Sequence, residues 1–159
     1  MKLTAKGRYA VTAMLDLAAR PDGAPVTLGD IAARQDISLA FLEQLFVKLR
    51  RGGLVRSHRG PAGGYVLALA PERISVGDII RAVEEPIQMT CGSDGREGCA
   101  KPNRCTTHEL WARLGRYIHG YLDSITLGGL LRGEALGDAL PAAARDRPGV
   151  GNVWHPEVR

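Results

Sequence analysis

Residues 27–69 carry two short helical patterns joined by a tight turn, with a glycine-rich hairpin directly behind them. Apolar residues recur at helical spacing over residues 28–34 and again over residues 39–51. Two strand-like stretches follow at residues 54–57 and 65–69. Two short helices joined by a turn are typical of a helix-turn-helix, and a hairpin in this position is typical of a wing. The sequence therefore predicts a mainly α-helical fold with a small β-wing, a winged helix-turn-helix.

Capping residues predict where these helices begin and end. Thr27 precedes the first of the two short helices, and Asp30 three residues later is an acidic relative of a capping box. Ser38 stands where it can cap the following helix, which Gly52-Gly53 ends. An earlier helix is predicted from apolar spacing over residues 3–20. The two capped helices are expected to form the helix-turn-helix.

Basic residues gather in the same part of the chain. Between Arg34 and Tyr65 six basic residues stand against two acidic ones, whereas the formal net charge of all 159 residues is only +4. Such a cluster fits a surface that binds double-stranded DNA, although charged runs are also common on ordinary solvated surfaces. We predict DNA contacts from the outward face of the helix over residues 39–51, from its cap, from the hairpin tip and from the first helix: Ser38, Ala40, Glu43, Gln44, Lys48, Arg50, Arg51, Arg59, Gly60 and Tyr9.

These residue types predict different roles on DNA. Arg59 in the hairpin tip is predicted to enter a minor groove, and Lys48, Arg50 and Arg51 are predicted to lie nearer phosphates. A carboxylate that faces DNA costs affinity unless it accepts a hydrogen bond, so Glu43 is predicted to accept one from a cytosine amino group. The alternative is that Glu43 is a surface residue paired with Lys48 or another neighbour.

Three more helices are predicted after the hairpin. Ser75 with Asp78 begins one that runs through Glu85, and a short last helix is predicted over residues 126–136. Between them a Thr106–Glu109 capping box begins a long helix with one apolar stripe: Leu110, Leu114, Tyr117, Ile118, Tyr121, Leu122 and Ile125. The stripe either covers the domain core or forms a dimer interface. We favour a dimerisation helix, because helix-turn-helix regulators usually read two half-sites with two copies.

Three cysteines stand in a glycine-rich segment that lacks periodicity. Cys91, Cys99 and Cys105 are separated by seven and five residues, and His108 follows after two more. Thiolates with one imidazole complete a four-coordinate site for zinc or for an iron-sulfur cluster. The lack of a closely spaced cysteine pair argues mildly against structural zinc. The residue types alone leave zinc, a cluster and three incidental thiols open.

The predicted organisation has four parts: a winged helix-turn-helix DNA-binding domain at 1–86, a cluster-binding loop at 87–106, a dimerisation helix with a short terminal helix at 107–136, and a disordered tail at 137–159. No apolar run approaches the roughly 20 residues of a membrane span. The N-terminus lacks the pattern of a signal peptide. We expect a cytoplasmic protein without a membrane partner.

An enzyme is the least favoured class. A zinc hydrolase or deaminase needs an open metal position and a general base, and Glu109 beside His108 is the only candidate. Glu109 already fits the capping box, and no other substrate-site signature is present. We predict that the chain is not an enzyme.

Motifs along most of the chain carry a family resemblance. They are Met1–Val11, Ile37–Leu39 with Leu42–Phe46, Val55–Pro61, Gly63–Tyr65, Thr107–Trp111 and Ile125–Gly128. In these segments the chain resembles the winged-helix family of iron-sulfur cluster regulators typified by IscR, and the resemblance runs from Met1 to about Leu131.

The resemblance implies a homodimeric transcription regulator, mainly a repressor, that holds a [2Fe-2S] cluster and controls genes for iron-sulfur cluster assembly. The ligands that it implies are Cys91, Cys99, Cys105 and His108. The first interval between cysteines is longer than is usual in that family, which implies a bulge around residues 93–97. A related branch senses nitric oxide with a [4Fe-4S] cluster and uses a carboxylate near the partner's N-terminus. Because the first acidic residue here is Asp16, that branch is disfavoured but stays open.

Overall fold

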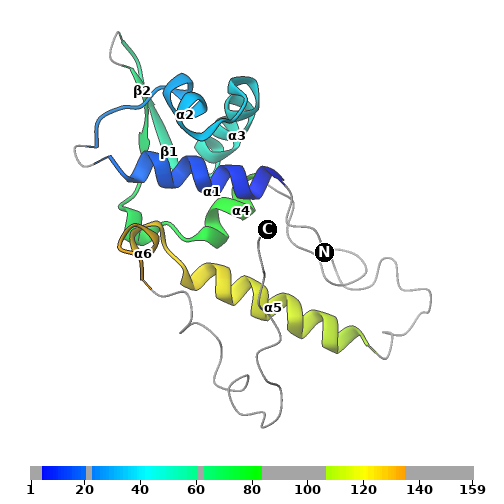
Figure 1. Cartoon of the computed structure of the whole chain (residues 1–159). Helices are drawn as coiled ribbons and strands as arrows, with labels where there is room; N and C mark the ends of the chain where they lie inside the picture. The colour runs from blue at the N-terminus through cyan, green and yellow to red at the C-terminus, as the bar shows by residue number, and fades with distance from the viewer. Residues whose placement is uncertain (1–4, 21–22, 61–62, 84–106, 135–159) are drawn as a thin grey trace, which may run out of the picture.

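A computed structural model describes residues 5–20, 23–60, 63–83 and 107–134, apart from the side chain of His108. In chain order its elements are α1 Ala5–Ala18, α2 Leu28–Gln35, α3 Leu39–Arg51, β1 Val55–His58, β2 Gly64–Leu67, the 3-10 helix η1 Pro71–Arg73, α4 Val76–Val83, α5 His108–Ser124 and α6 Leu127–Leu131. Figure 1 shows the small hairpin of β1 and β2 at one edge, beside α1, α2 and α3. The predicted mainly α-helical fold with a β-wing is confirmed.

Local hydrogen bonds shape the helix-turn-helix. The Oγ1 of Thr27 accepts a hydrogen bond from the N–H of Asp30 at 3.1 Å, so the predicted cap of α2 is confirmed. α2 ends at Asp36, whose left-handed φ of 51° turns the chain towards α3. Ser38 occupies the N-cap position of α3, but its side chain accepts no capping hydrogen bond. The prediction that Ser38 caps α3 is therefore wrong, and the turn leaves this residue exposed.

The wing is a two-stranded antiparallel hairpin with a third segment at its edge. β1 and β2 pair from Val55 opposite Leu67 to His58 opposite Gly64. Val26 joins the free edge of β2 by exchanging backbone hydrogen bonds of 3.0 and 2.8 Å with Tyr65. A Cβ at Gly64 would lie 2.5 Å from the Val26 carbonyl oxygen, so the close approach requires glycine. This bridge fastens the loop between α1 and α2 to the wing.

One apolar core joins helices that are distant in the sequence. Phe46 of α3 is fully buried, and its ring packs edge-to-face on Tyr65 of β2 with ring centres 4.9 Å apart. Leu127 of α6 is equally buried in the same core. Its N–H also donates to the carbonyl of Ile74 at 2.9 Å. In packing terms α6 belongs with the winged domain, although it follows the predicted domain boundary at residue 86.

A reciprocal cap begins α4. The N–H of Asp78 donates to Ser75 Oγ at 3.0 Å, and the N–H of Ser75 donates to Asp78 Oδ2 at 3.0 Å. The predicted capping box is confirmed. Burial alone would raise the pKa of the Asp78 carboxyl, but the Ser75 hydrogen bonds and Arg81 outweigh burial and hold this pKa below its usual value. The predicted end of this helix at Glu85 lies outside the described residues.

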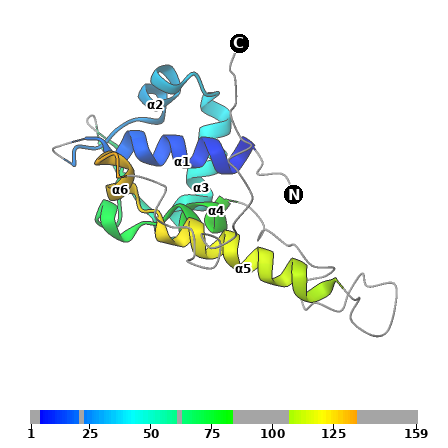
Figure 2. The same cartoon turned by 60° about the horizontal axis from the view of Figure 1, so that its bottom comes forward.

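α5 leaves the winged domain at an angle, packs its C-terminal part near α4 and projects its N-terminal end outwards (Figure 1 and Figure 2). The helix begins at His108 with Thr107 as its N-cap, and Thr106 lies outside the described residues. Glu109 is thus one position too early for a capping box. Its Oε1 instead accepts a hydrogen bond from Arg116 at 3.1 Å. The structure thus places the N-cap at Thr107 and not at Thr106, and the predicted Thr106–Glu109 box stays a prediction because Thr106 lies outside the described residues.

The final helix is shorter than predicted. α6 begins at Leu127 and ends at Leu131, and its N-cap Thr126 accepts a hydrogen bond at Oγ1 from the N–H of Gly129 at 3.1 Å. The segment predicted to continue it to residue 136 is described only as far as residue 134. The predicted cluster loop at 87–106 and the predicted tail at 137–159 lie outside the described residues.

Candidate nucleic-acid interface

The two faces of α3 differ sharply in burial. Leu42, Leu45, Phe46 and Leu49 are buried in the core. The opposite face is exposed and carries half of the predicted DNA contacts: Ala40, Glu43, Gln44, Arg50 and Arg51. Figure 1 shows α3 and the wing at the end of the molecule that lies away from α5. This end presents an exposed helix beside a hairpin, which is the arrangement of a winged helix that enters a major groove.

Val47 is a surface residue that the sequence analysis missed. It is 39% exposed and lies outside the apolar core of the domain. Its spacing of three residues from Gln44 and four from Glu43 puts it in the same exposed stripe. That spacing was the available signal, but an apolar side chain is normally assigned to a core.

The side chain of Lys48 does not extend from α3 towards the predicted position of the DNA phosphates, but contacts α4. Its Nζ donates a hydrogen bond to the backbone carbonyl of Val83 at 3.0 Å. Val83 ends α4, where unpaired carbonyls and the helix dipole favour a positive charge. Lys48 therefore joins α3 to α4. No ion pair joins it to Glu43, and within the described part of the chain Glu43 forms no ion pair with any residue.

The other predicted contacts flank α3. Arg59 and Gly60 are exposed at the wing, where Gly60 adopts a φ of 120°. Residues 61 and 62 of the tip lie outside the described residues. Tyr9 of α1 is 42% exposed, and its ring packs edge-to-face on Phe41 of α3 at 5.8 Å. Tyr9 therefore lies beside α3, as expected for a contact that supports the same surface.

A buried carboxylate connects α1 with α2. Asp16 accepts two hydrogen bonds from Arg34, of 3.0 and 2.6 Å, and a third from Gln35 at 2.7 Å. The Arg34 guanidinium is the main cause that holds the pKa of Asp16 below its usual value, against the opposing effect of burial. Only 6% of the Asp16 side chain is exposed. Both oxygens of this carboxylate already accept hydrogen bonds from α2, so Asp16 is not a candidate metal ligand.

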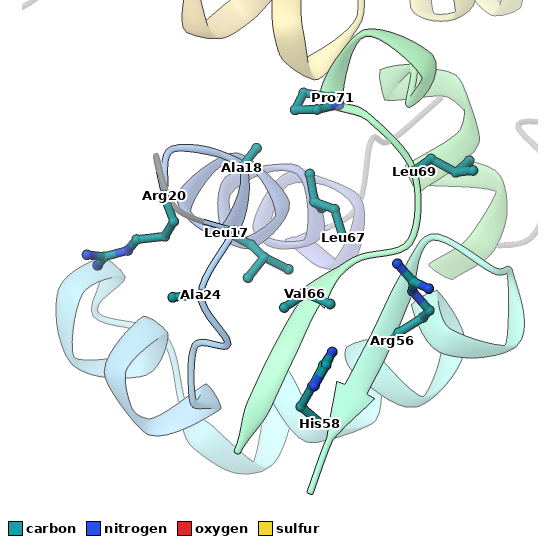
Figure 3. A pocket seen from close by; sticks show the side chains of 11 residues that line it. Leu17, Ala18, Arg20, Ala24, Arg56, His58, Val66, Leu67, Leu69 and Pro71 are labelled. Atoms are coloured by element: carbon teal, nitrogen blue, oxygen red, sulfur yellow. The ribbon is translucent and has the colours of Figure 1, made fainter. Parts of the chain in front are cut away.

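A hollow of about 590 Å³ lies between the end of α1 and the outer side of the wing. Figure 3 shows Leu17, Val66 and Leu67 at its apolar floor and Arg56 and His58 on β1 at one side. The Arg20 side chain points away from the hollow in the same view. Small-molecule sites usually have polar groups that converge on one point, and these basic side chains do not converge.

The predicted metal ligands are outside the part that the structure describes. Cys91, Cys99 and Cys105 fall within residues 84–106, and only the backbone of His108 is described, as the first residue of α5. Within the described residues, no group of three or more histidine, cysteine or acidic side chains could hold a metal ion. The ligand set of three cysteines and one histidine stays a prediction.

The projecting part of α5 exposes a large apolar surface. Leu110 is 59% exposed, Trp111 42%, Leu114 37% and Tyr117 48%. Their spacing places them on neighbouring positions of one helix face. An apolar stripe of this kind commonly marks an interface with another protein. The stripe predicted from the sequence is therefore divided, because Ile118, Tyr121, Leu122 and Ile125 are only partly exposed in the half of α5 that lies nearer the domain.

A family model described as an iron-dependent transcriptional regulator, Rrf2, matches residues 3–133. The chain belongs to the Rrf2 family. The HTH-type transcriptional regulator IscR of Aliivibrio salmonicida is 56% identical over 131 residues, which cover 82% of this chain and 77% of the relative. IscR of Serratia proteamaculans is 50% identical over 145 residues, 91% of this chain and 86% of the relative. The predicted resemblance to IscR regulators is confirmed.

Solved structures of Rrf2-type regulators share the fold. A T. potens IscR structure is 39% identical with a TM-score of 0.70, covering 91% of this chain and 96% of that one. CymR, the global cysteine regulator of B. subtilis, is 38% identical with a TM-score of 0.70, covering 85% and 99%. As an Rrf2 protein, this chain is a DNA-binding transcription regulator and not an enzyme. None of the helices in the described residues is long and apolar enough to cross a membrane.

Proposed function

We propose that this Rrf2 protein is a homodimeric regulator, mainly a repressor, that senses iron-sulfur cluster status through a [2Fe-2S] cluster and controls genes for iron-sulfur cluster assembly. As a regulator of operators on chromosomal DNA it would act in the cytoplasm. The observation that carries the proposal is the exposed face of α3 beside the wing, in a chain about half identical to relatives named IscR.

The DNA-reading part of the proposal follows from the geometry of this end of the molecule. α3 would enter a major groove with Ala40, Glu43 and Gln44 towards base edges. Arg59 at the exposed wing would reach into the adjacent minor groove. Arg50 and Arg51 would lie near phosphates, which makes binding strongly salt-dependent.

The sensing part rests on the donor set and on the similarity to IscR regulators. Three thiolates from Cys91, Cys99 and Cys105 with the imidazole of His108 are a chemically suitable set for a [2Fe-2S] cluster. When bound, such a cluster supplies a redox-active iron centre. His108 begins α5, and α5 packs on α4, so the ligand segment is attached at both ends to elements of the described structure.

Two other metal sites are less well supported. A [4Fe-4S] cluster with a carboxylate ligand would need an acidic residue near the N-terminus, and Asp16 is already held by Arg34 and Gln35. A structural zinc ion suits the same donor types but usually has two closely spaced cysteines. Both alternatives give different spectra from a [2Fe-2S] cluster.

The dimer is proposed on the exposed stripe of α5. Two copies would bury Leu110, Trp111, Leu114 and Tyr117 against each other and present two α3 helices to two half-sites. A C2 interface of this kind uses the same face on both subunits.

Anaerobic purification tests the proposal. We expect a coloured dimer with thiolate-to-iron absorption and a resonance signal after one-electron reduction, and binding to the promoter upstream of its own gene. The variants Cys91→Ala, Cys99→Ala, Cys105→Ala and His108→Ala should each lose or alter the spectrum. A colourless protein that contains zinc would contradict the sensing part, whereas loss of DNA binding would contradict the regulator as a whole.

A further inference from the structure

Val47 lies near the middle of the exposed face of α3. It is four residues after Glu43, three after Gln44 and four before Arg51, and these spacings place all four side chains on one side of a helix. All four residues are exposed. Val47 is thus the branched apolar side chain among Glu43, Gln44 and Arg51 on this surface.

The fold does not require a valine at this position. Val47 lies outside the apolar core, whereas the inward face of α3 is supplied by leucines and Phe46. A β-branched residue also has a lower helix propensity than alanine or a long straight side chain. Exposed Tyr9 differs, because its ring packs on Phe41. Neither burial nor helix propensity explains the branched apolar side chain of Val47.

We propose that Val47 reads the 5-methyl group of a thymine in the major groove, and thereby selects thymine at one position of each half-site. This inference rests on the proposed DNA-binding mode of α3. The thymine methyl is the apolar group that a base pair presents in that groove, and small apolar side chains recognise it by van der Waals contact. Arg50 and Arg51 on the same helix provide the charge complementarity that brings this face to DNA.

The neighbours of Val47 suit this assignment. Gln44 can hydrogen-bond an adenine, and an adenine on one strand has its thymine on the other. Ala40, one further turn along the same stripe, is small enough not to hold the helix away from the bases. The three residues Ala40, Gln44 and Val47 therefore form a surface that fits an A·T step, next to the carboxylate of Glu43.

The test begins with selection of binding sites from a randomised pool by the purified full-length dimer. Each thymine in the selected half-site is then replaced singly by uracil, which differs only by the missing methyl. For the unaltered protein we expect one position whose replacement weakens binding about threefold to fivefold, as for losing one buried methyl. In Val47→Ala the same replacement should have no effect. Val47→Ala removes no core contact and raises helix propensity, so folding should be kept and is checked by circular dichroism.

Leu69→Ala is the matched control, because Leu69 is also 39% exposed and belongs to the segment after β2 and not to α3. This variant should keep the full uracil effect. If replacing thymine by uracil weakens binding equally in Val47→Ala and in the unaltered protein, another residue contacts the methyl group and the inference is overturned. A selected site without a methyl-sensitive thymine would overturn it as well. If no binding site is selected from the pool, the proposed DNA-binding mode of α3 is contradicted, and the inference about Val47 fails with it.

Discussion

At Asp16 a single carboxylate connects α1 with α2. The bidentate contact with Arg34 and the bond from Gln35 satisfy the carboxylate from one side of α2. The pKa of Asp16 is therefore lower in the folded state than its ordinary value of 3.8. A carboxyl group with a lowered folded pKa stabilises the protein above its unfolded pKa, and this contribution is lost as the pH falls through the folded value.

We expect Asp16→Asn to lower the free energy of unfolding at neutral pH by about 1 to 3 kcal/mol, because the Arg34 guanidinium loses its charged partner. At a pH well below 3.8 the two proteins should approach each other in stability. Denaturant unfolding from pH 7 to pH 2.5 measures both effects. If the difference in the free energy of unfolding stays constant over that pH range, the charge of the Asp16 carboxylate does not stabilise the fold.

Lys48 and Arg51 provide a contrast between two cations on α3. Lys48 binds the end of α4, whereas Arg51 is exposed on the outward face. We expect Lys48→Met to cost about 0.5 to 1 kcal/mol of stability with little change in the salt dependence of DNA binding. Arg51→Met should leave stability nearly unchanged and reduce the slope of log K against log salt by about one per subunit. Thermal unfolding measures the stability effect, and salt titrations of DNA binding measure the phosphate contacts. A reduced salt slope in Lys48→Met with unchanged stability would show that Lys48 contacts phosphates.

At the scale of elements, a contact could be predicted from the sequence when its two residues are close together along the chain. The caps of α2 and α4 were predictable, because Thr27 with Asp30 and Ser75 with Asp78 are three residues apart. The bridge between Val26 and Tyr65 was not, since it joins segments that only the tertiary fold brings together. The same reason explains why the contact between Lys48 and Val83 was missed. Within the candidate site, the outward face of α3 followed from helical spacing, whereas the direction of each long side chain did not.

The junction between α4 and α5 is a second element-scale feature. Arg81 of α4 contacts Asp123 near the end of α5 at 2.6 Å and Asp78 at 2.7 Å. Gly77 permits the close approach, because a Cβ there would overlap the Asp123 carboxylate. These contacts hold the end of α5 on the domain while its beginning projects. The apolar stripe is thus held away from the core and is available to a second copy.

We expect Leu114→Glu to convert the dimer to a monomer, since two carboxylates would be buried at the centre of the proposed interface. Arg113→Glu is the matched control, because it introduces the same side chain beside the stripe at a position that is 63% exposed. Light scattering measures the mass of each variant, and circular dichroism checks that both are folded. A Leu114→Glu protein that stays dimeric would place the interface elsewhere.

At the scale of the whole molecule, α4 packs against both α3 at the DNA-reading end and the C-terminal part of α5. α1 contacts both α4 and α6, α3 contacts α4, and α4 contacts α5, so these described helices are packed in one continuous series. A rearrangement between α4 and α5, where the proposed cluster segment is attached, would therefore be transmitted to α3 through packed helices. The contact between Lys48 and Val83 is the most direct of these connections. DNA selectivity is accordingly expected to depend on whether the cluster is bound.

Glu43 is the residue at which this dependence should be visible. It is exposed on the outward face of α3, and a carboxylate brought to DNA without a hydrogen-bond donor is penalised. We expect Glu43→Ala to bind a wider set of sequences without an overall loss of affinity.

We also expect Glu43→Ala to reduce the difference in site preference between the cluster-bound protein and an apo form made with Cys105→Ala. Binding of all four combinations to a randomised operator pool measures both effects, with Glu72→Ala as a control that removes an exposed carboxylate of η1, outside α3 and the wing. If Glu43→Ala keeps the original preference in both cluster states, Glu43 is only a solvated residue of the helix, and the cluster acts on DNA through another part of the interface.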